Sequence, residues 1–240
     1  MLKSPNGINV ILFDLDGTLR HSRPSSEHAF FDFAVQLGAK DSPKRRLEAM
    51  RWLHHYWAQS PLMIQDQVTF QDDEEGFWTN FTRRYLIKFG CSEEKAKEIA
   101  GPVRKLMDEQ YKPEDVVLPG TLETLGELKE AGFRLGIVTN RTNPCDDYLQ
   151  TLGLTDYFEI TVVAGSIASW KPDPRIFEHT LETMKADPEA AIYVGDNYYA
   201  DIIGARRAGI QPVLIDPEGV FPDPGCPVIS KISELEEVLK

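Results

Sequence analysis

Two carboxylates stand close together at the end of an apolar run near the start of the chain. The run, residues 8–13, is partly β-branched and predicts a strand buried on both faces, as in a parallel sheet. Asp14 and Asp16 follow it, and Gly17 supplies the backbone freedom for a sharp turn. Open α/β sheets bind their ligands at such strand ends. One carboxylate there can act as nucleophile and metal ligand, and its neighbour as proton donor.

Two other interpretations of this stretch have to be weighed. A calcium-binding loop of the EF-hand type is disfavoured, because Gly17 directly follows the second Asp and the twelfth position from Asp14 is Ser25 instead of Glu. A plain turn at a strand end stays open as long as this stretch is considered alone.

Further polar groups follow later apolar runs or precede helices: Thr139, Asn140, Lys171, Asp196 and Asp201. Each has an ordinary explanation on its own, as a turn residue, a solvated charge or a helix cap. Together they place several carboxylates, a hydroxyl and an ammonium group at one edge of one sheet. Phosphoryl transfer needs that set: a nucleophile, a divalent cation, and donors for the phosphoryl oxygens.

The elements that must position these groups alternate between strands and helices from Leu118 onward. Strands are expected at 133–139, 158–163, 190–194, 213–215 and near 228, and helices at 121–131, 144–152, 173–185, 200–208 and from 233. Such alternation implies a parallel sheet covered on both faces. The strand before Asp14 is the first strand of the same sheet.

A helical segment interrupts this pattern between the first and second strands. Residues 25–111 show helical periodicity and no convincing strand, and their apolar stripes predict four helices, at about 29–37, 47–57, 77–89 and 92–106, the second of them ended by Pro61. We therefore predict two domains. The core comprises residues 1–20 and 115–240, and the inserted all-helical domain comprises residues 21–114.

The composition limits the class of protein and its partners. Hydrophobic residues make up 42% and charged residues 27%, as in an ordinary globular protein. A net charge of −12 disfavours nucleic acid as a partner, although it leaves a small phosphorylated molecule open. No apolar run of about 18 residues and no signal peptide is visible, so we expect no membrane span and a cytoplasmic location. Three distant cysteines argue against a disulfide framework and a zinc site.

The polar stretches, taken together, resemble the four motifs of the haloacid dehalogenase superfamily. Residues 14–18 are similar to its first motif, Thr139 to its second, Lys171 to its third and residues 195–201 to its fourth. The resemblance covers about residues 8–215 apart from the insertion. It implies an α/β fold, with a Rossmann-like three-layer α/β/α core around a parallel sheet. It also implies that the inserted helices form a cap domain between strands 1 and 2.

The same resemblance implies a role for each residue. Asp14 would attack phosphorus, Asp16 would protonate the leaving alcohol and later activate water, and Lys171 would neutralise negative charge. The phosphoryl oxygens would be bound by Thr139, Asn140 and Lys171. Mg²⁺ would be the cofactor, held by Asp14, the backbone carbonyl of Asp16, Asp196 and Asp201.

The second carboxylate also separates the branches of the superfamily. Dehalogenases need no acid to protonate a halide and typically lack it, so Asp16 favours phosphoryl transfer. The mutase-like branch commonly has His about twelve positions after the nucleophile, where this chain has Ser26. We therefore expect a phosphoric monoester hydrolase, a phosphatase acting on a small phosphorylated metabolite. A phosphomutase, or a non-catalytic regulatory or binding protein that retains the motifs, remains the alternative.

The identity of the substrate is not fixed by the sequence. Arg20 and His21 follow the first motif closely and are candidates to face the substrate. The aromatic and histidine cluster at 52–57 would either line a pocket or place Leu53 and Trp57 in the core of the insertion and the rest at its surface. The oligomeric state is not readable from the sequence.

Overall fold

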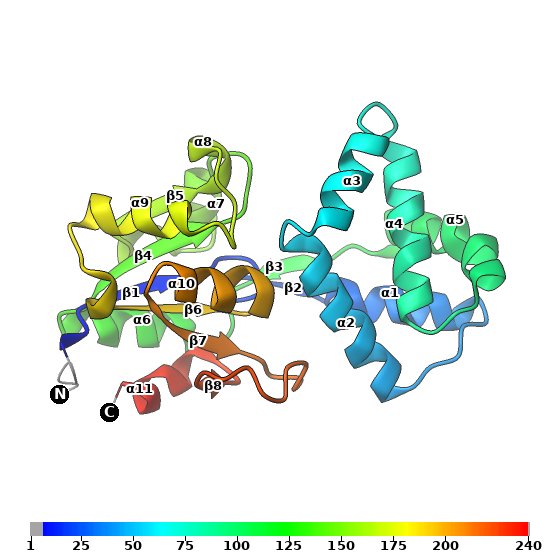
Figure 1. Cartoon of the computed structure of the whole chain (residues 1–240). Helices are drawn as coiled ribbons and strands as arrows, with labels where there is room; N and C mark the ends of the chain where they lie inside the picture. The colour runs from blue at the N-terminus through cyan, green and yellow to red at the C-terminus, as the bar shows by residue number, and fades with distance from the viewer. Residues whose placement is uncertain (1–6, 240) are drawn as a thin grey trace. The chain divides into compact units, whose positions relative to one another are not determined.

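A computed structural model describes residues 7–239 (Figure 1). The strands are β1 (Val10–Phe13), β2 (His21–Arg23), β3 (Glu114–Val116), β4 (Arg134–Thr139), β5 (Ile160–Val163), β6 (Ala191–Gly195), β7 (Gln211–Ile215) and β8 (Val228–Ile229). The helices are α1 (Ser26–Gln36), α2 (Pro43–Trp57), α3 (Pro61–Thr69), α4 (Glu74–Lys88), α5 (Glu93–Gln110), α6 (Thr121–Glu130), α7 (Asp146–Thr151), α8 (Ala164–Ile167), α9 (Pro174–Met184), α10 (Ile203–Arg207) and α11 (Leu235–Val238). Short helical turns are η2 (Thr155–Tyr157), η3 (Pro188–Ala190), η4 (Tyr198–Ile202) and η5 (Ile232–Glu234).

The chain folds as two compact units. The α/β unit contains the described residues up to His21 and from Val116 onward, and the helical unit is Ser22–Asp115. The chain passes from one unit to the other within β2 and β3, which form a two-stranded sheet. The helical unit is therefore inserted into the α/β unit after β1.

A six-stranded parallel sheet forms the middle layer of the α/β unit, in the order β5-β4-β1-β6-β7-β8. After β1 the chain builds β4 and β5 on one side, then returns to build β6, β7 and β8 on the other side. The order thus reverses between β1 and β6, and open α/β sheets bind ligands at this point, beyond the carboxyl ends of the strands.

Alternate residues of β1 face two different apolar cores, one on each side of the sheet. Ile11 and Phe13 pack in a cluster that includes residues of α6, α7 and α11. Val10 and Leu12 pack in a second cluster that includes residues of α9 and α10. Figure 1 shows α6 and α11 on one face of the sheet and α9 and α10 on the other. This arrangement confirms the predicted α/β class with a Rossmann-like three-layer core.

The helical unit has five helices among the described residues, where the sequence pattern predicted four. The missing prediction is α3, because Pro61 was interpreted as the end of the preceding helix. Pro61 instead occupies the start of α3, with the Ser60 side chain capping the backbone N–H of Met63 at 3.1 Å. Ser at the N-cap followed by Pro is a common helix start, because Pro lacks an N–H that this position would leave unpaired.

The aromatic core of the helical unit also differs from the expectation. Tyr56, which was expected at the surface, is fully buried, and Trp57 is only partly so. The Tyr56 ring packs against Phe81 with 5.3 Å between centroids, and its hydroxyl donates to the buried carboxylate of Asp66 at 3.1 Å. Aromatic residues of this kind can be buried when the hydroxyl finds an acceptor. The cluster at 52–57 is therefore largely accounted for by packing.

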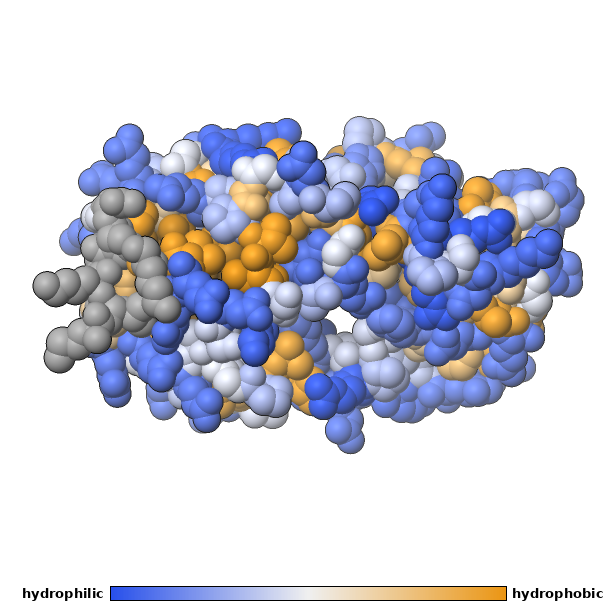
Figure 2. Space-filling view, turned by 90° about the horizontal axis from the view of Figure 1, so that it is seen from below, coloured by the Kyte–Doolittle hydropathy of each residue, from blue (hydrophilic) through white to orange (hydrophobic). Residues whose placement is uncertain are grey.

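Hydrophilic residues cover most of the molecular face drawn in Figure 2, and hydrophobic residues form separate patches between them. Across the described residues, every helix is too short or too polar to span a bilayer.

Candidate active site

The predicted site residues meet in the α/β unit, at the carboxyl edge of its six-stranded sheet. Asp14 directly follows β1, Thr139 ends β4 and Asp196 directly follows β6. Because β1 pairs in parallel with both neighbours, with Phe13 opposite Ile137 and Val194, these three strand ends reach the same edge. The backbone N–H of Asp14 donates to the carbonyl of Val194 at 2.9 Å, which holds the nucleophile candidate beside β6.

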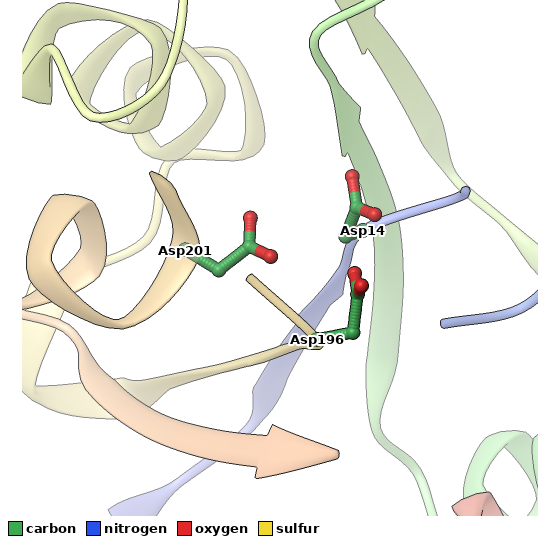
Figure 3. A group of neighbouring side chains, drawn as sticks. All are labelled: Asp14, Asp196 and Asp201. Atoms are coloured by element: carbon green, nitrogen blue, oxygen red, sulfur yellow. The ribbon is translucent and has the colours of Figure 1, made fainter. Parts of the chain in front are cut away.

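Three carboxylates form a compact acidic group at this edge: Asp14, Asp196 and Asp201. Each offers one oxygen, and these oxygens all lie within 4.8 Å of one another. Figure 3 shows the three side chains converging from the ends of β1 and β6 and from the turn that follows β6. Asp14 and Asp201 are buried, with exposures of 6% and 1%. An all-oxygen donor set of this kind suits a hard divalent cation such as Mg²⁺.

Two glycines allow the carboxylates to approach the backbone. Gly17 has φ of +91°, and a Cβ built on it would lie 2.5 Å from an oxygen of Asp196. A Cβ on Gly195 would lie 2.4 Å from the carboxylate carbon of Asp201. Real Cβ atoms do not come this close, so a side chain at either position would displace a carboxylate.

Lys171 is the cationic partner of this group. Its Nζ donates to Asp14 Oδ1 at 2.5 Å and to Asp201 Oδ1 at 2.7 Å, and its side chain is only 2% exposed. A buried ammonium paired with two carboxylates is rigidly held, because moving away from both would leave its charge uncompensated away from water. The position fits the predicted role of neutralising negative charge near Asp14.

Sequence reasoning missed Tyr193, which lies on β6 and is fully buried. Its hydroxyl accepts a hydrogen bond from Lys171 Nζ at 2.9 Å and donates to the backbone carbonyl of Val138 at 3.0 Å. Its hydroxyl is also 3.2 Å from Asp201 Oδ1. The signal in the sequence was a tyrosine in an otherwise aliphatic buried strand, since a buried hydroxyl needs a partner.

The turn η4 after β6 positions Asp201. The backbone N–H of Asn197 donates to Asp201 Oδ2 at 2.9 Å, while the Asn197 side-chain oxygen accepts from the N–H groups of Tyr199 and Ala200 at 3.0 Å. This wider turn replaces the start of the α-helix expected from residue 200, and α10 begins only at Ile203. The aromatic rings of Tyr198 and Phe221 stack with centroids 5.3 Å apart.

Burial, reinforced by neighbouring carboxylates, shifts the pKa values of the acidic group. Burial raises the pKa of Asp14 to about 7, and Asp201 adds to this rise while Lys171 opposes it. Burial and the charges of Asp14 and Asp201 raise the pKa of Asp196 well above its ordinary value. Burial alone would lower the pKa of Lys171, but the two carboxylates outweigh it and raise it. Three carboxylates therefore face a single ammonium, and a bound divalent cation would offset the excess negative charge.

We predict that replacing Asp196 by asparagine stabilises the protein in the absence of divalent cations. Removing this carboxylate should raise the free energy of unfolding, because burial and the charges of Asp14 and Asp201 disfavour an ionised group at this position. The same variant should lose the stabilisation that Mg²⁺ gives to the wild type by binding the folded state. Calorimetric melting in Mg²⁺ and in chelator would measure both effects. An exposed control, Asp223→Asn, should respond to Mg²⁺ like the wild type, and a wild-type melting temperature indifferent to Mg²⁺ would contradict the metal assignment.

Thr139 and Asn140 lie where the motif comparison expected them, but their contacts differ. The Asn140 amide makes two hydrogen bonds with the backbone of Lys171, accepting from its N–H at 2.7 Å and donating to its carbonyl at 3.0 Å. Asn140 therefore fixes the loop that carries Lys171. The Thr139 hydroxyl is buried at the strand end and accepts from the N–H of Arg141 at 3.3 Å.

Asp16 faces two arginines. Arg141 donates to both of its carboxylate oxygens at 2.8 Å, from Nε to Oδ2 and from Nη2 to Oδ1. Arg20 Nη1 lies 3.4 Å from Asp16 Oδ1, so the candidate Arg20 is indeed next to the predicted proton donor. His21 Nε2 lies 3.2 Å from the backbone carbonyl of Thr18. The sequence motifs did not indicate Arg141, which belongs to the same loop as Thr139 and Asn140.

Comparison with known proteins places this geometry in a family. A family profile, described as haloacid dehalogenase-like hydrolase, matches residues 8–209. A phosphoserine phosphatase from Thermus thermophilus is 26% identical, over 96% of this chain and 98% of that protein. A glyceraldehyde 3-phosphate phosphatase from Methanopyrus kandleri is 29% identical, over 87% of this chain and 84% of that protein.

A solved structure gives the same result for the whole fold. The crystal structure of a 2-haloacid dehalogenase from Pseudomonas syringae pv. Tomato DC3000 is similar over 97% of this chain and 98% of that chain, with a TM-score of 0.53 and 27% identity. The phosphatase relatives bear out the resemblance to phosphatase-like members that the motifs indicated. The chain belongs to the haloacid dehalogenase-like hydrolase family.

Proposed function

We propose that the protein is a Mg²⁺-dependent phosphatase that hydrolyses a small phosphate monoester through an aspartyl-phosphate on Asp14. One observation carries this proposal. Asp14 is buried at the end of the central strand, 2.5 Å from the ammonium of Lys171 and within the acidic group that includes Asp196 and Asp201. A carboxylate in such surroundings can attack phosphorus, since positive charge nearby reduces its repulsion by the phosphate.

In the first half of the reaction, an oxygen of Asp14 forms a bond to phosphorus and the bond between phosphorus and the ester oxygen breaks. Asp16, in its protonated form, gives its proton to the departing alcohol oxygen. Lys171 offsets charge on Asp14 and on the phosphoryl group, and Thr139 contributes a hydroxyl donor to the phosphoryl oxygens. Asn140 acts indirectly, by fixing the Lys171 loop through its two backbone hydrogen bonds.

In the second half, water attacks the phosphorus of the aspartyl-phosphate, and the bond between phosphorus and Asp14 breaks. Asp16, now ionised, accepts a proton from that water, as microscopic reversibility requires of the group that donated it. Inorganic phosphate leaves, and both carboxyl groups return to their starting forms. The balance is therefore one ester and one water converted to one alcohol and one phosphate.

The carboxylates of Asp14, Asp196 and Asp201, with the backbone carbonyl of Asp16, would hold Mg²⁺. Burial and mutual repulsion of the carboxylates, which raise the pKa of Asp14 and Asp196, support a resident cation at this point. When bound, the ion supplies charge neutralisation between the nucleophile and the phosphoryl oxygens.

Asp16 distinguishes this proposal from dehalogenation, the activity named for the similar solved structure. A halide leaves as an anion and needs no proton, whereas an alkoxide is a poor leaving group unless it is protonated. We assign the inserted helices, predicted as residues 21–114, the role of a cap that contributes to substrate selection. The family resemblance supports this assignment.

We predict that the purified protein hydrolyses p-nitrophenyl phosphate in Mg²⁺ and loses this activity in excess chelator. Activity should return when Mg²⁺ is restored, because chelation removes the cation and leaves the carboxylates that bind it chemically unchanged. Release of p-nitrophenol measures it directly, and Asp223→Asn serves as a control outside the site. Full activity in chelator would overturn the metal requirement. Failure to hydrolyse any phosphate ester, with Mg²⁺ binding demonstrated by calorimetry, would overturn the phosphatase assignment itself.

A further inference from the structure

Asp16, Arg141 and Arg20 form a charged cluster close to Asp14, and the proposed mechanism gives a role only to Asp16. Both oxygens of Asp16 accept hydrogen bonds from one guanidinium, that of Arg141, at 2.8 Å each. This parallel two-bond geometry is the one in which arginine recognises a carboxylate most specifically. Arg20 approaches the same carboxylate to 3.4 Å. Arg141 and Arg20 thus form a cationic site that already holds one carboxylate.

Tyr148 supports this site independently of Asp16. The guanidinium carbon of Arg141 lies 4.2 Å from the centroid of the Tyr148 ring, within cation–π distance. The hydroxyl of the same tyrosine accepts a hydrogen bond from Arg20 Nε at 2.5 Å. The side chains of Arg141 and Arg20 are 28% and 20% exposed, so a small solute can reach them. The fork of Arg141 would therefore keep its orientation if Asp16 turned away.

The proposed mechanism requires Asp16 to interact with the departing oxygen of the ester. In the structure both Asp16 oxygens are engaged by Arg141, so this interaction competes with the ion pair. If Asp16 leaves the fork and nothing replaces it, Arg141 loses two charge-assisted hydrogen bonds, which are among the stronger ones in proteins. If another carboxylate enters the fork as Asp16 leaves, the hydrogen bonds of Arg141 are conserved.

We propose that the Arg141 fork is a subsite for a carboxylate on the leaving group of the substrate. This inference rests on the proposed phosphatase function and names its substrate class: phosphate monoesters whose alcohol carries a carboxylate near the ester oxygen. The substrate carboxylate replaces Asp16 in the fork, and Asp16, no longer paired with Arg141, takes up a proton from solvent and can then give it to the ester oxygen. The presence of Asp16 in the fork shows that a planar, two-oxygen anion fits this position. An ester with a neutral alcohol has no carboxylate to replace Asp16 beside Arg141. Its hydrolysis is therefore slower, because the ion pair between Asp16 and Arg141 must break without compensation.

Two pairs of probes isolate the carboxylate. O-phospho-L-serine differs from phosphoethanolamine only by a carboxylate, and 2-phosphoglycolate carries a carboxylate where ethyl phosphate has a methyl group. We expect kcat/KM to favour the carboxylate-bearing member of each pair by about 10- to 100-fold, the range expected for charge-assisted hydrogen bonds of Arg. Similar kcat/KM ratios in the two pairs would show that the preference does not require the amino group present in the first pair.

Variants at Arg141 assign the preference to the fork. Arg141→Gln should bring the ratio within each pair close to one, and Arg141→Lys should give an intermediate ratio because it keeps the charge without the fork. Damage to the fold or to the orientation of Asp16 would slow both members of a pair, so the ratio reports on recognition of the carboxylate.

Arg134→Gln is the matched control. Arg134 begins β4, the strand that precedes the Arg141 loop, and also pairs with both oxygens of a carboxylate, that of Glu159, with Nε 2.8 Å from Oε2. Its removal should leave both ratios at their wild-type values. Equal effects of Arg134→Gln and Arg141→Gln on the ratios would overturn the inference.

Binding provides a readout that does not depend on turnover. Calorimetric titration of the Asp14→Asn variant with 2-phosphoglycolate and with ethyl phosphate should show tighter binding of the former, and adding Arg141→Gln should remove the difference. If the wild type hydrolyses p-nitrophenyl phosphate but shows equal kcat/KM for the two members of each pair, the subsite is overturned and the phosphatase assignment stands. A protein that binds 2-phosphoglycolate selectively through Arg141 but hydrolyses no ester would support the subsite and overturn the phosphatase assignment.

Discussion

Replacing Asp14 by asparagine should abolish hydrolysis of phosphate esters and prevent the formation of any phospho-enzyme. An amide is a far poorer nucleophile than a carboxylate, so the covalent route is closed, and we expect kcat to fall by at least about 10⁵-fold. Rapid quenching of the enzyme with substrate, followed by peptide mass analysis, should find phosphate on residue 14 in the wild type and on no residue in the variant. Substantial turnover by the variant would mean that a different group attacks phosphorus.

The loss cannot be attributed to unfolding, because the same substitution should not weaken the metal-free protein. Burial raises the pKa of Asp14 from 3.8 to about 7. A carboxyl group whose pKa is raised in the folded state disfavours folding once it ionises. Wild-type stability should therefore decline, through this group, as the pH rises from about 4 to about 7. Asp14→Asn should remove that decline, and chemical denaturation at several pH values in chelator would show it. Asp156→Asn, an exposed control in the same unit, should retain it.

The meeting of the candidate site residues could be predicted because it depends on strand ends alone. Asp14, Thr139 and Asp196 each follow an apolar run, and parallel pairing in register brings the ends of those runs to one edge whatever the details of the loops. Lys171 needed more than this rule, since it lies in a loop before α9. Its assignment came from the motif resemblance, and its 2.5 Å contact with Asp14 is consistent with that assignment.

The parts that escaped prediction depend on contacts between side chains far apart in the sequence. The hydroxyl of Tyr193 reaches Lys171 and the carbonyl of Val138, and neither partner can be inferred from the periodicity of β6. The ion pair between Asp16 and Arg141 is of the same kind. By contrast, helix α3 could have been found, since Ser60 and Pro61 form a local start signal that was interpreted as a stop.

Asp16→Asn should have a large effect of a different kind from that of Asp14→Asn. The substitution leaves the nucleophile and the backbone carbonyl of residue 16 in place but removes the proton donor and acceptor. General acid–base catalysis typically contributes about 10²–10⁴-fold, so hydrolysis of alkyl phosphates should slow by roughly that factor. An aryl phosphate with an acidic phenol needs little protonation of its leaving oxygen, so its first step should slow much less.

The second step distinguishes the roles of Asp14 and Asp16 most clearly. Hydrolysis of the aspartyl-phosphate needs a base to activate water, regardless of which alcohol has left. With an aryl phosphate, Asp16→Asn should therefore release a rapid burst of phenol and then stall with phosphate attached to Asp14. Stopped-flow absorbance would record the burst, and its amplitude should match the phosphorylated fraction found by rapid quench and peptide mass analysis. Arg141→Gln provides the contrast, because it removes the ion pair with Asp16 but retains the base, so it should turn over the aryl phosphate without accumulating the adduct. Phosphate found on residue 16 in the wild type, or equal slowing of aryl and alkyl esters by Asp16→Asn without a burst, would show that the nucleophile and the proton carrier have been assigned the wrong way round.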